Sequence, residues 1–177
     1  VEGSCDLLIT HHHDSQPFQL GADRYEMVSL GKEPLAPYSK PDAEGRPLYC
    51  LPGKPSEPLP YLGYAPGAYL GRITELILKQ SSTPIHLDRV YETDMAEGLK
   101  AMALEGQGVA FLPYSAVKKE LKARRLVSAA PPGGAPLEMV MDVRAYREKP
   151  TGKEPPKGTA QALWEYLQTQ AGSGTAV

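Results

Sequence analysis

The sequence predicts an α/β fold, in which strands and helices alternate and the strands form a largely parallel sheet. Three adjoining patterns between residues 91 and 121 predict it. Asp94 and Glu97 have the spacing of a capping box, which predicts the start of a helix. The apolar residues of that helix recur at the spacing of one face, at Met95, Leu99, Met102 and Ala103.

The second and third patterns are a buried strand and another helix. Gly106 and Gly108 end the first helix, and an apolar run at 109–112 follows them. A short apolar run between Gly and Pro is typical of a buried strand. Pro113 and Ser115 then end that strand and begin a helix at about 116–124.

The flanking segments predict further elements in the order strand, loop, strand, connection. A strand is predicted at 6–10 with Cys5 beside it, a polar loop at 11–17, and an extended segment at 25–30. Eight prolines between 34 and 60 predict mostly connection and surface turns there, because proline disrupts helices and central strands. An apolar strand at 137–143 and a helix at 157–170 follow, the helix with Ala160, Leu163, Trp164 and Leu167 on one face.

Composition limits the classes of function. The chain has 177 residues, a net charge of −2 and two cysteines. It contains no apolar run long enough to cross a membrane, and its cysteine usage fits a reducing cytoplasm. Its acidic balance disfavours a nucleic-acid-binding domain, and the basic run 118–125 is interpreted as the solvated face of a helix.

These patterns resemble the effector-binding domain of LysR-type transcriptional regulators. In that family a strand leads to an acidic helix start, a small-residue turn, a strand like GVAFLP and a helix like SAV, as in Tyr91–Leu121. The segments 5–10, 24–39, 59–78 and 140–147 and the helix around Trp164 also resemble family segments, whereas 40–58 and 127–137 do not. GAYLGR, the HHHD turn, RAYR and ALWEYL are closest to the hypochlorite-responsive, oxidative-stress branch.

The resemblance implies a type 2 periplasmic-binding-protein-like fold, with two Rossmann-like lobes and a ligand cleft between them. Residues 1–39 with 138–171 would form the first lobe, 40–137 the second, and 172–177 a flexible tail. The first lobe would lack its initial strand and helix. The DNA-binding winged helix-turn-helix would lie outside this chain.

Candidate effector-binding residues stand where strands end and helices begin, because ligands of open α/β sheets bind there. They are Thr10, His11, Tyr64, Gly67, Tyr69, Leu70, Arg72, Glu92, Thr93, Met95 and Pro113. The helix after Gly67 would offer backbone N–H groups to an anion, and Arg72 could reinforce this or form an ordinary surface ion pair. Tyr64, Tyr69, Tyr91 and Tyr114 would supply an aromatic wall, although some of them must be core or rim.

Other chemistry has weaker signals. The run His11–Asp14 suggests a metal site, but adjacent strand side chains point to opposite sides, so we expect a polar loop and no metal; His86 is expected at the surface. No catalytic or phosphate-binding motif is present, and we expect neither an enzyme nor a cofactor. Cys5 and Cys50 do not resemble tuned redox thiols. Met95 stands at the position of a methionine that is implicated in the hypochlorite-responsive branch. At a second position where that branch would have a methionine, this chain has Leu70. Core packing is the simpler role for Met95.

The sequence therefore predicts a cytoplasmic, ligand-sensing regulatory domain with no membrane association. In the intact protein a small polar, anionic or oxidising effector would shift the two lobes, and a homodimer or tetramer would pass this to DNA-binding domains outside the chain. Two alternatives remain: a solute-binding protein on the same fold, and an enzyme on that fold whose turnover would depend on Arg72 or Glu92.

Overall fold

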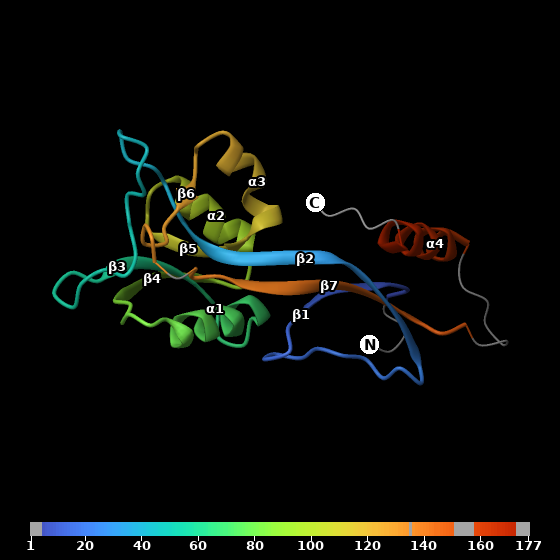
Figure 1. Ribbon diagram of the computed structural model, residues 1–177. Coiled ribbons are helices and arrows are strands. Elements are labelled where there is room, and N and C mark those ends of the chain that lie inside the picture. The colour runs from blue at the N-terminus through green and yellow to red at the C-terminus, as the bar shows by residue number, and fades with distance from the viewer. Residues whose placement is uncertain (1–4, 135, 151–157, 173–177) are drawn as a thin grey trace. The chain divides into compact units, whose positions relative to one another are not determined.

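The computed structural model describes residues 5–134, 136–150 and 158–172 (Figure 1). Contacts divide the chain into two compact units, one made of Val1–Glu33 with Val140–Val177 and the other of Pro34–Met139. We call them the terminal unit and the central unit. The sequence places the lobe boundaries at 39/40 and 137/138, and the contacts place the division at 33/34 and 139/140.

The central unit alternates strands and helices, as the α/β prediction requires. Its elements are the second part of β2 (Tyr25–Ser39), β3 (Leu59–Tyr64), α1 (Tyr69–Gln80), β4 (Leu87–Thr93), α2 (Ala96–Leu104), β5 (Val109–Pro113), α3 (Tyr114–Lys122) and β6 (Val127–Ser128). The strand order is β2-β5-β3-β4, with β6 on β2. β3 is parallel to both β4 and β5, whereas β5 is antiparallel to β2.

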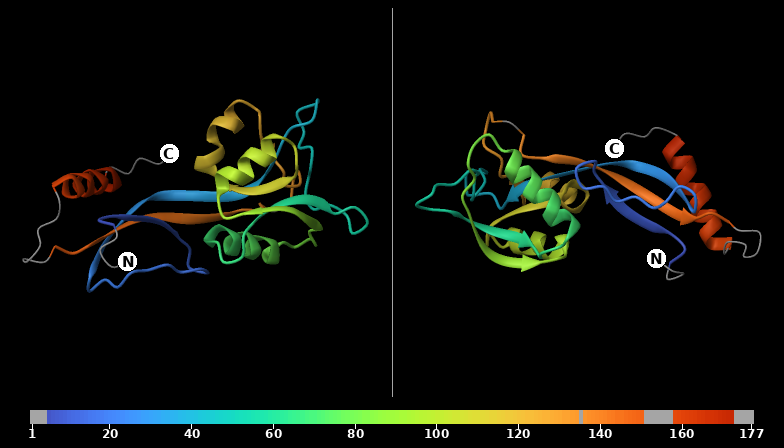
Figure 2. Two further views of the ribbon diagram at one scale, coloured as in Figure 1. Left: turned by 180° about the vertical axis from the view of Figure 1, so that it is seen from behind. Right: turned by 90° about the horizontal axis from the view of Figure 1, so that it is seen from below.

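Helices cover both faces of this sheet. Figures 1 and 2 show α1 on one face and α2 with α3 on the other. Because side chains alternate along a strand, Leu62 and Ala110 join the core under α2 and α3, while Tyr61 and Phe111 point the opposite way and meet edge to face at 6.5 Å. The buried core under α2 and α3 is Tyr38, Leu62, Tyr64, Leu99, Ala103, Ala110, Leu112, Val117 and Leu126.

Helix α2 begins close to the predicted position, but the predicted capping residue is wrong. Asp94 does not cap the helix; Met95 is the N-cap residue, and no side chain caps it. Thr93 Oγ1 instead accepts a hydrogen bond from the Met95 backbone N–H at 3.3 Å. Leu99 and Ala103 are buried as predicted, but Met95 is 63% exposed because it precedes the helix and does not share its apolar face.

Proline does not exclude residues 34–39 from a strand, which corrects the prediction of a connection there. β2 continues through Pro34 and Pro37, and Pro37 pairs with Phe111 of β5. The Pro37 carbonyl accepts from the Ala129 N–H at 3.0 Å, on the side where β6 has only two residues. The missing N–H of Pro37 therefore lies at the end of a short ladder, where little pairing is lost.

The terminal unit contains β1 (Leu8–His12), the first part of β2, β7 (Met139–Glu148) from its second residue onward and α4 (Gly158–Gly172), with the strand order β1-β7-β2. β1 runs antiparallel to β7, from the pair Leu8 and Tyr146 to the pair His12 and Asp142. The predicted strand at 6–10 is thus two residues too early. His11 and His12 are strand residues, and Cys5 lies ahead of the strand.

One aromatic residue anchors α4. Trp164 is 1% exposed, and the Arg147 guanidinium lies 4.7 Å from the centroid of its ring. The same guanidinium donates to Glu26 and Gln161, both at 2.6 Å. Leu163 is 45% exposed, so the predicted apolar face was too wide. The predicted tail lies, from residue 173 onward, outside the described residues.

No helix within the described ranges has the length and apolar character needed to span a membrane.

Candidate functional site

Three parallel strands of the central unit end at the same edge of the sheet. Tyr64 of β3 pairs with Thr93 of β4, and the pairing of Leu62 with Ala110 brings the end of β5 to the same level. The Ala65 N–H donates to the Thr93 carbonyl at 2.9 Å and holds the loop after β3 against the end of β4. We call this region, residues 64–68, 93–95 and 113, the strand-end edge. It is where open α/β sheets bind ligands.

A helix begins directly at each of these strand ends. Ala68, Met95 and Pro113 are the N-cap residues of α1, α2 and α3, all three have extended backbones, and none provides a side-chain cap. The first N–H groups of a helix have no acceptor within the helix, and the helix dipole adds partial positive charge there. The strand-end edge therefore combines three helix starts that favour a bound anion or carboxylate.

Two glycines shape the start of α1. Gly67 has φ +88°, a left-handed conformation that glycine adopts without steric cost. At Gly71 an added Cβ would lie 3.0 Å from Tyr64 Cβ, closer than ordinary contact. The sequence GAYLGR thus lets the chain turn sharply after β3 and lets α1 pack closely against the strand end.

A pocket of about 200 Å³ lies between the start of α1 and the strands beside it. Its lining residues are Tyr61, Tyr64, Ala65, Pro66, Gly67, Ala68, Gly71, Arg72, Glu75, Leu78 and Arg89. Of the eleven predicted site residues, three line this pocket: Tyr64, Gly67 and Arg72. It is small for a drug-sized ligand and matches a small polar compound or an ion better.

Two arginines of this pocket are held by local contacts. Arg72 donates to the Gly67 carbonyl at 2.6 Å and lies 5.7 Å from the centroid of the Tyr69 ring. Arg89 donates to Glu92 at 2.7 Å and to the Tyr64 carbonyl at 3.2 Å. The predicted residue Glu92 is therefore engaged in an ion pair on β4, in which both side chains are partly exposed.

The predicted aromatic wall is only partly present. Tyr64 is buried, and its hydroxyl donates to the Phe111 carbonyl at 3.0 Å, so this hydroxyl serves the core. Burial raises the pKa of Tyr64, and the neighbouring Tyr61 raises it further. Tyr91 and Tyr114 are 36% and 38% exposed and do not line the pocket, nor does Tyr69. Burial also raises the pKa of Tyr61, an effect that the nearby Arg89 opposes.

Eight of the lining residues were not among the predicted site residues, and three of these have polar or charged side chains: Tyr61, Glu75 and Arg89. Tyr61 and Arg89 are paired between β3 and β4, and the guanidinium lies 5.6 Å from the centroid of the tyrosine ring. Only the register between the two strands brings them together, and no local pattern signals that register. Glu75 could have been found, because it lies one turn after Arg72 in the same helix.

The remaining predicted residues have the following places. Leu70 packs against the core, and Thr93 and Met95 lie at the strand-end edge with Pro113. Thr10 and His11 lie on β1 in the terminal unit, where Thr10 Oγ1 donates to the His11 carbonyl at 3.3 Å. Burial lowers the pKa of His11, and the charge of Glu33 opposes this shift.

The three consecutive histidines have separate environments. His12, expected in a polar loop, is 5% exposed, with Nδ1 at 2.9 Å from the Phe18 carbonyl and Nε2 at 3.3 Å from Asp14. His13 Nδ1 accepts from the Ser15 N–H at 3.1 Å. Across the described residues, no group of three or more His, Cys, Asp and Glu side chains could hold a metal ion.

Comparison with known proteins gives matches over nearly the whole chain. The family model described as "LysR substrate binding domain" matches residues 1–172. The chain is 27% identical to the HTH-type transcriptional regulator YjiE of Escherichia coli K12, over 94% of this chain and 50% of that protein. It therefore spans about half the length of this relative.

Two solved structures have the same fold. The apo regulatory domain of HypT from Salmonella typhimurium has a TM-score of 0.78 at 23% identity, over 97% of this chain and 75% of that one. Vibrio fischeri DarR, solved in complex with DNA, has a TM-score of 0.75 at 26% identity, over 94% of this chain and 51% of that one. The fold is of the type 2 periplasmic-binding-protein-like class. With its family model matched from residue 1 to 172, this chain belongs to the LysR substrate-binding domain family.

Proposed function

We propose that this chain is the effector-sensing regulatory domain of a LysR-type transcription regulator and that it binds a small polar or anionic effector at the strand-end edge. One observation carries the proposal. The ends of β3, β4 and β5 meet there, and each is followed by a helix that begins without a side-chain cap. Backbone N–H groups at such helix starts are strong, preorganised donors to an anion.

The contacting residues proposed in the central unit are Tyr64, Gly67, Tyr69, Leu70, Arg72, Glu92, Thr93, Met95 and Pro113. Arg72 would add a cation beside the start of α1, and the backbone of Gly67 would allow close approach. Tyr64 would contribute through its backbone, because its hydroxyl is bonded to Phe111. In the terminal unit, Thr10 and His11 are the residues proposed to contact an effector.

In the intact protein, the effector would bias a homodimer or tetramer, and attached DNA-binding domains would respond. Two relatives support this: YjiE of Escherichia coli is an HTH-type transcriptional regulator, and Vibrio fischeri DarR was solved in complex with DNA. Family membership favours a regulator over a solute-binding protein or an enzyme. The ion pair of Glu92 with Arg89 also disfavours Glu92 as a catalytic acid or base.

An NMR titration of the isotopically labelled chain with sodium bromide and with sodium acetate tests the proposed site. We expect the largest shifts in the backbone amides at 67–71 and 95–98, and weaker binding after Arg72→Gln. Arg46→Gln is the matched control, because Arg46 is an exposed arginine in a turn outside the strand-end edge. Shifts spread evenly over the surface, or equal losses in both variants, would contradict the proposal.

Methionine oxidation is a second candidate mechanism, and the exposure of Met95 favours it. Its side chain is 63% exposed and lies at the N-cap of α2, at the strand-end edge. Oxidation to the sulfoxide would add a polar oxygen there without disturbing the core. HypT of Salmonella typhimurium is a hypochlorite-specific LysR-type transcriptional regulator. Whether oxidation of Met95 changes the binding of bromide separates this mechanism from plain ligand binding.

A further inference from the structure

A basic surface lies on α3 and the residues after it. Lys118, Lys119 and Lys122 project from the exposed side of the helix, opposite the buried Val117 and Glu120. Arg124 and Arg125 follow directly and are also exposed. We call these five side chains the α3 ridge. It is locally cationic although the chain as a whole has a net charge of −2.

The surroundings do not neutralise the ridge. The one acidic residue in this stretch, Glu120, is 8% exposed and bonded to Arg125 at 3.0 Å. Lys118, Lys119, Lys122 and Arg124 form no ion pair within the described part of the chain.

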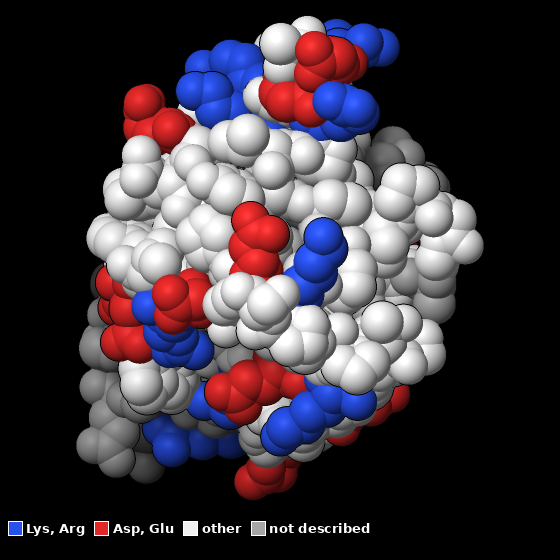
Figure 3. All heavy atoms as spheres, turned by 90° about the vertical axis from the view of Figure 1, so that its left-hand side faces the viewer, with Lys and Arg blue, Asp and Glu red and all other residues white. Residues whose placement is uncertain are grey.

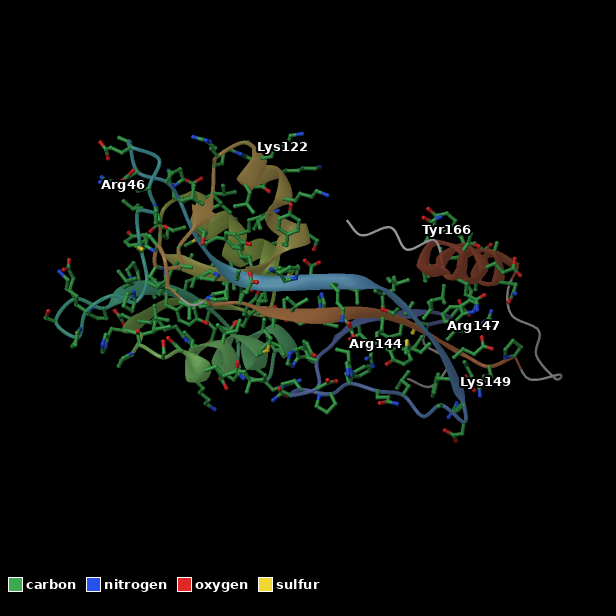
Figure 4. All side chains as sticks on the ribbon, viewed as in Figure 1. Arg46, Lys122, Arg144, Arg147, Lys149 and Tyr166 are labelled. Carbon is green, nitrogen blue, oxygen red and sulfur yellow. The ribbon has the colours of Figure 1, made fainter. Side chains whose placement is uncertain are left out.

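The segment after β2 lies beside the ridge, because β6 pairs antiparallel with the end of β2 through Ser39 and Val127. The charges of that segment balance, since Lys40 and Arg46 offset Asp42 and Glu44. At the top of Figure 3 Lys and Arg side chains lie beside Asp and Glu side chains, and Figure 4 shows Lys122 and Arg46 pointing outward there. The acidic residues of the turn beside them, Asp42 and Glu44, are both bonded to Arg46.

Arg124 occupies a position that normally favours glycine. Its φ is +52°, and the Arg125 N–H donates to the Glu120 carbonyl at 2.8 Å, the pattern of a helix end with a left-handed residue. An L-residue with a Cβ is strained there. Cations near a helix end stabilise the helix dipole, but the two lysines in the last turn of α3 already serve that purpose. A strained arginine on an exposed surface suggests that the charge itself has a use.

We infer that the α3 ridge, which the sequence alone indicates as an ordinary solvated helix face, is a contact surface for the phosphate backbone of DNA, separate from the effector site. The composition of the ridge favours DNA over an acidic protein. The ridge consists of three Lys and two Arg side chains, with no aromatic or aliphatic anchor among them. Lys is depleted in protein interfaces, whereas Arg is enriched, and interfaces usually depend on aromatic anchors that the ridge lacks. Lysine and arginine without apolar partners suit a regular array of phosphates, which position a protein without reading sequence.

Counterion release predicts the strength of this contact. Each phosphate neutralised contributes about −0.9 to the slope of log K against log salt concentration, so three to five contacts give a slope of roughly −3 to −5. Affinity would then fall about 60- to 1,000-fold between roughly 50 and 200 mM salt. Such binding is weak and independent of sequence, and it would orient the domain on DNA that another part of the protein recognises.

The test is fluorescence anisotropy of the full chain with a labelled DNA duplex of arbitrary sequence, at several salt concentrations. We expect Lys118→Gln with Lys122→Gln to reduce the slope by about two. The control, Lys54→Gln with Lys79→Gln, removes the same charge from exposed lysines outside the ridge and should leave the slope nearly unchanged. Circular dichroism of both double variants checks their folding.

A second variant, Arg124→Gly, removes one ridge charge and the strained backbone together. It should bind DNA more weakly, with a slope reduced by about one, while its melting temperature rises. No binding of the duplex at low salt would overturn the inference, and so would equal losses in the two double variants. Tighter binding of poly-glutamate than of DNA would overturn it in favour of an acidic protein partner. None of these results depends on whether an effector binds at the strand-end edge.

Discussion

The substitution Tyr64→Phe separates the stability of the strand-end edge from its ability to bind a ligand. Tyr64 is 3% exposed, and its hydroxyl donates to the Phe111 carbonyl at 3.0 Å, which joins β3 to β5 inside the core. Phenylalanine keeps the ring and removes only this donor. Losing a hydrogen bond to a buried acceptor costs about 1–2 kcal/mol, which would lower the melting temperature by roughly 2–8 °C.

The substitution should also change the response to high pH. Burial raises the pKa of Tyr64 above 10, its unfolded value. Because the pKa of Tyr64 is higher in the folded chain, its protonated hydroxyl contributes stability that is fully present below pH 10. This stability is lost as the pH rises through the folded pKa. The free energy of unfolding of the native chain should therefore fall as the pH rises above 10. The free energy of unfolding of the Tyr64→Phe variant should fall less steeply.

Urea denaturation followed by circular dichroism, at neutral pH and above pH 10, measures both effects. Tyr166→Phe is the control, because Tyr166 is 59% exposed and should show neither effect. Binding of bromide or acetate should be unchanged in Tyr64→Phe. A variant as stable as the native chain would refute the structural role assigned to the hydroxyl, and loss of anion binding would refute its assignment to the core.

Three further predictions concern other parts of the molecule. Burial lowers the pKa of His11 from 6.5, so the neutral imidazole contributes stability that is present above pH 6.5 and is lost as the pH falls through the folded pKa. The difference between the melting temperatures at pH 7.5 and pH 5.5 should therefore be smaller in His11→Gln than in His13→Gln. Equal differences in the two variants would contradict this. Arg124→Gly should raise the free energy of unfolding by about 0.5–1 kcal/mol, because glycine removes the strain at φ +52°. If urea denaturation shows a lower free energy of unfolding instead, the arginine side chain stabilises the end of the helix. Hypochlorite should oxidise Met95, 63% exposed, well before Met141, which is fully buried, as peptide mass mapping would detect; simultaneous oxidation would indicate that the core had opened.

The local part of the fold could be predicted from the sequence because its signals are local. Apolar periodicity, two glycines and a proline sufficed to place α2, β5 and α3 in order. The start of α3 was predicted two residues late, because Pro113 takes the N-cap position itself and the helix begins at Tyr114. Asp94 had the expected spacing for a cap, but the Thr93 hydroxyl reached the backbone instead.

Features that depend on pairing between distant segments could not be predicted. The presence of Pro37 predicted that its segment is not a strand. A proline is tolerated in β2 because its missing N–H lies on the side of β6, which has only two residues to pair with. The composition of the pocket has the same origin, since Arg89 reaches Tyr61 through the register of β3 with β4. The strand ends themselves were predictable, because connectivity alone determines where a helix follows a strand.

Bromide soaking of crystals of this chain, with anomalous diffraction to locate the ions, shows whether an anion binds at the strand-end edge. We expect an ion there, within hydrogen-bond distance of backbone N–H groups at the starts of α1, α2 or α3 and close to Arg72. Ions found only elsewhere, for example along the lysines of the α3 ridge, would contradict an anion site at the strand-end edge.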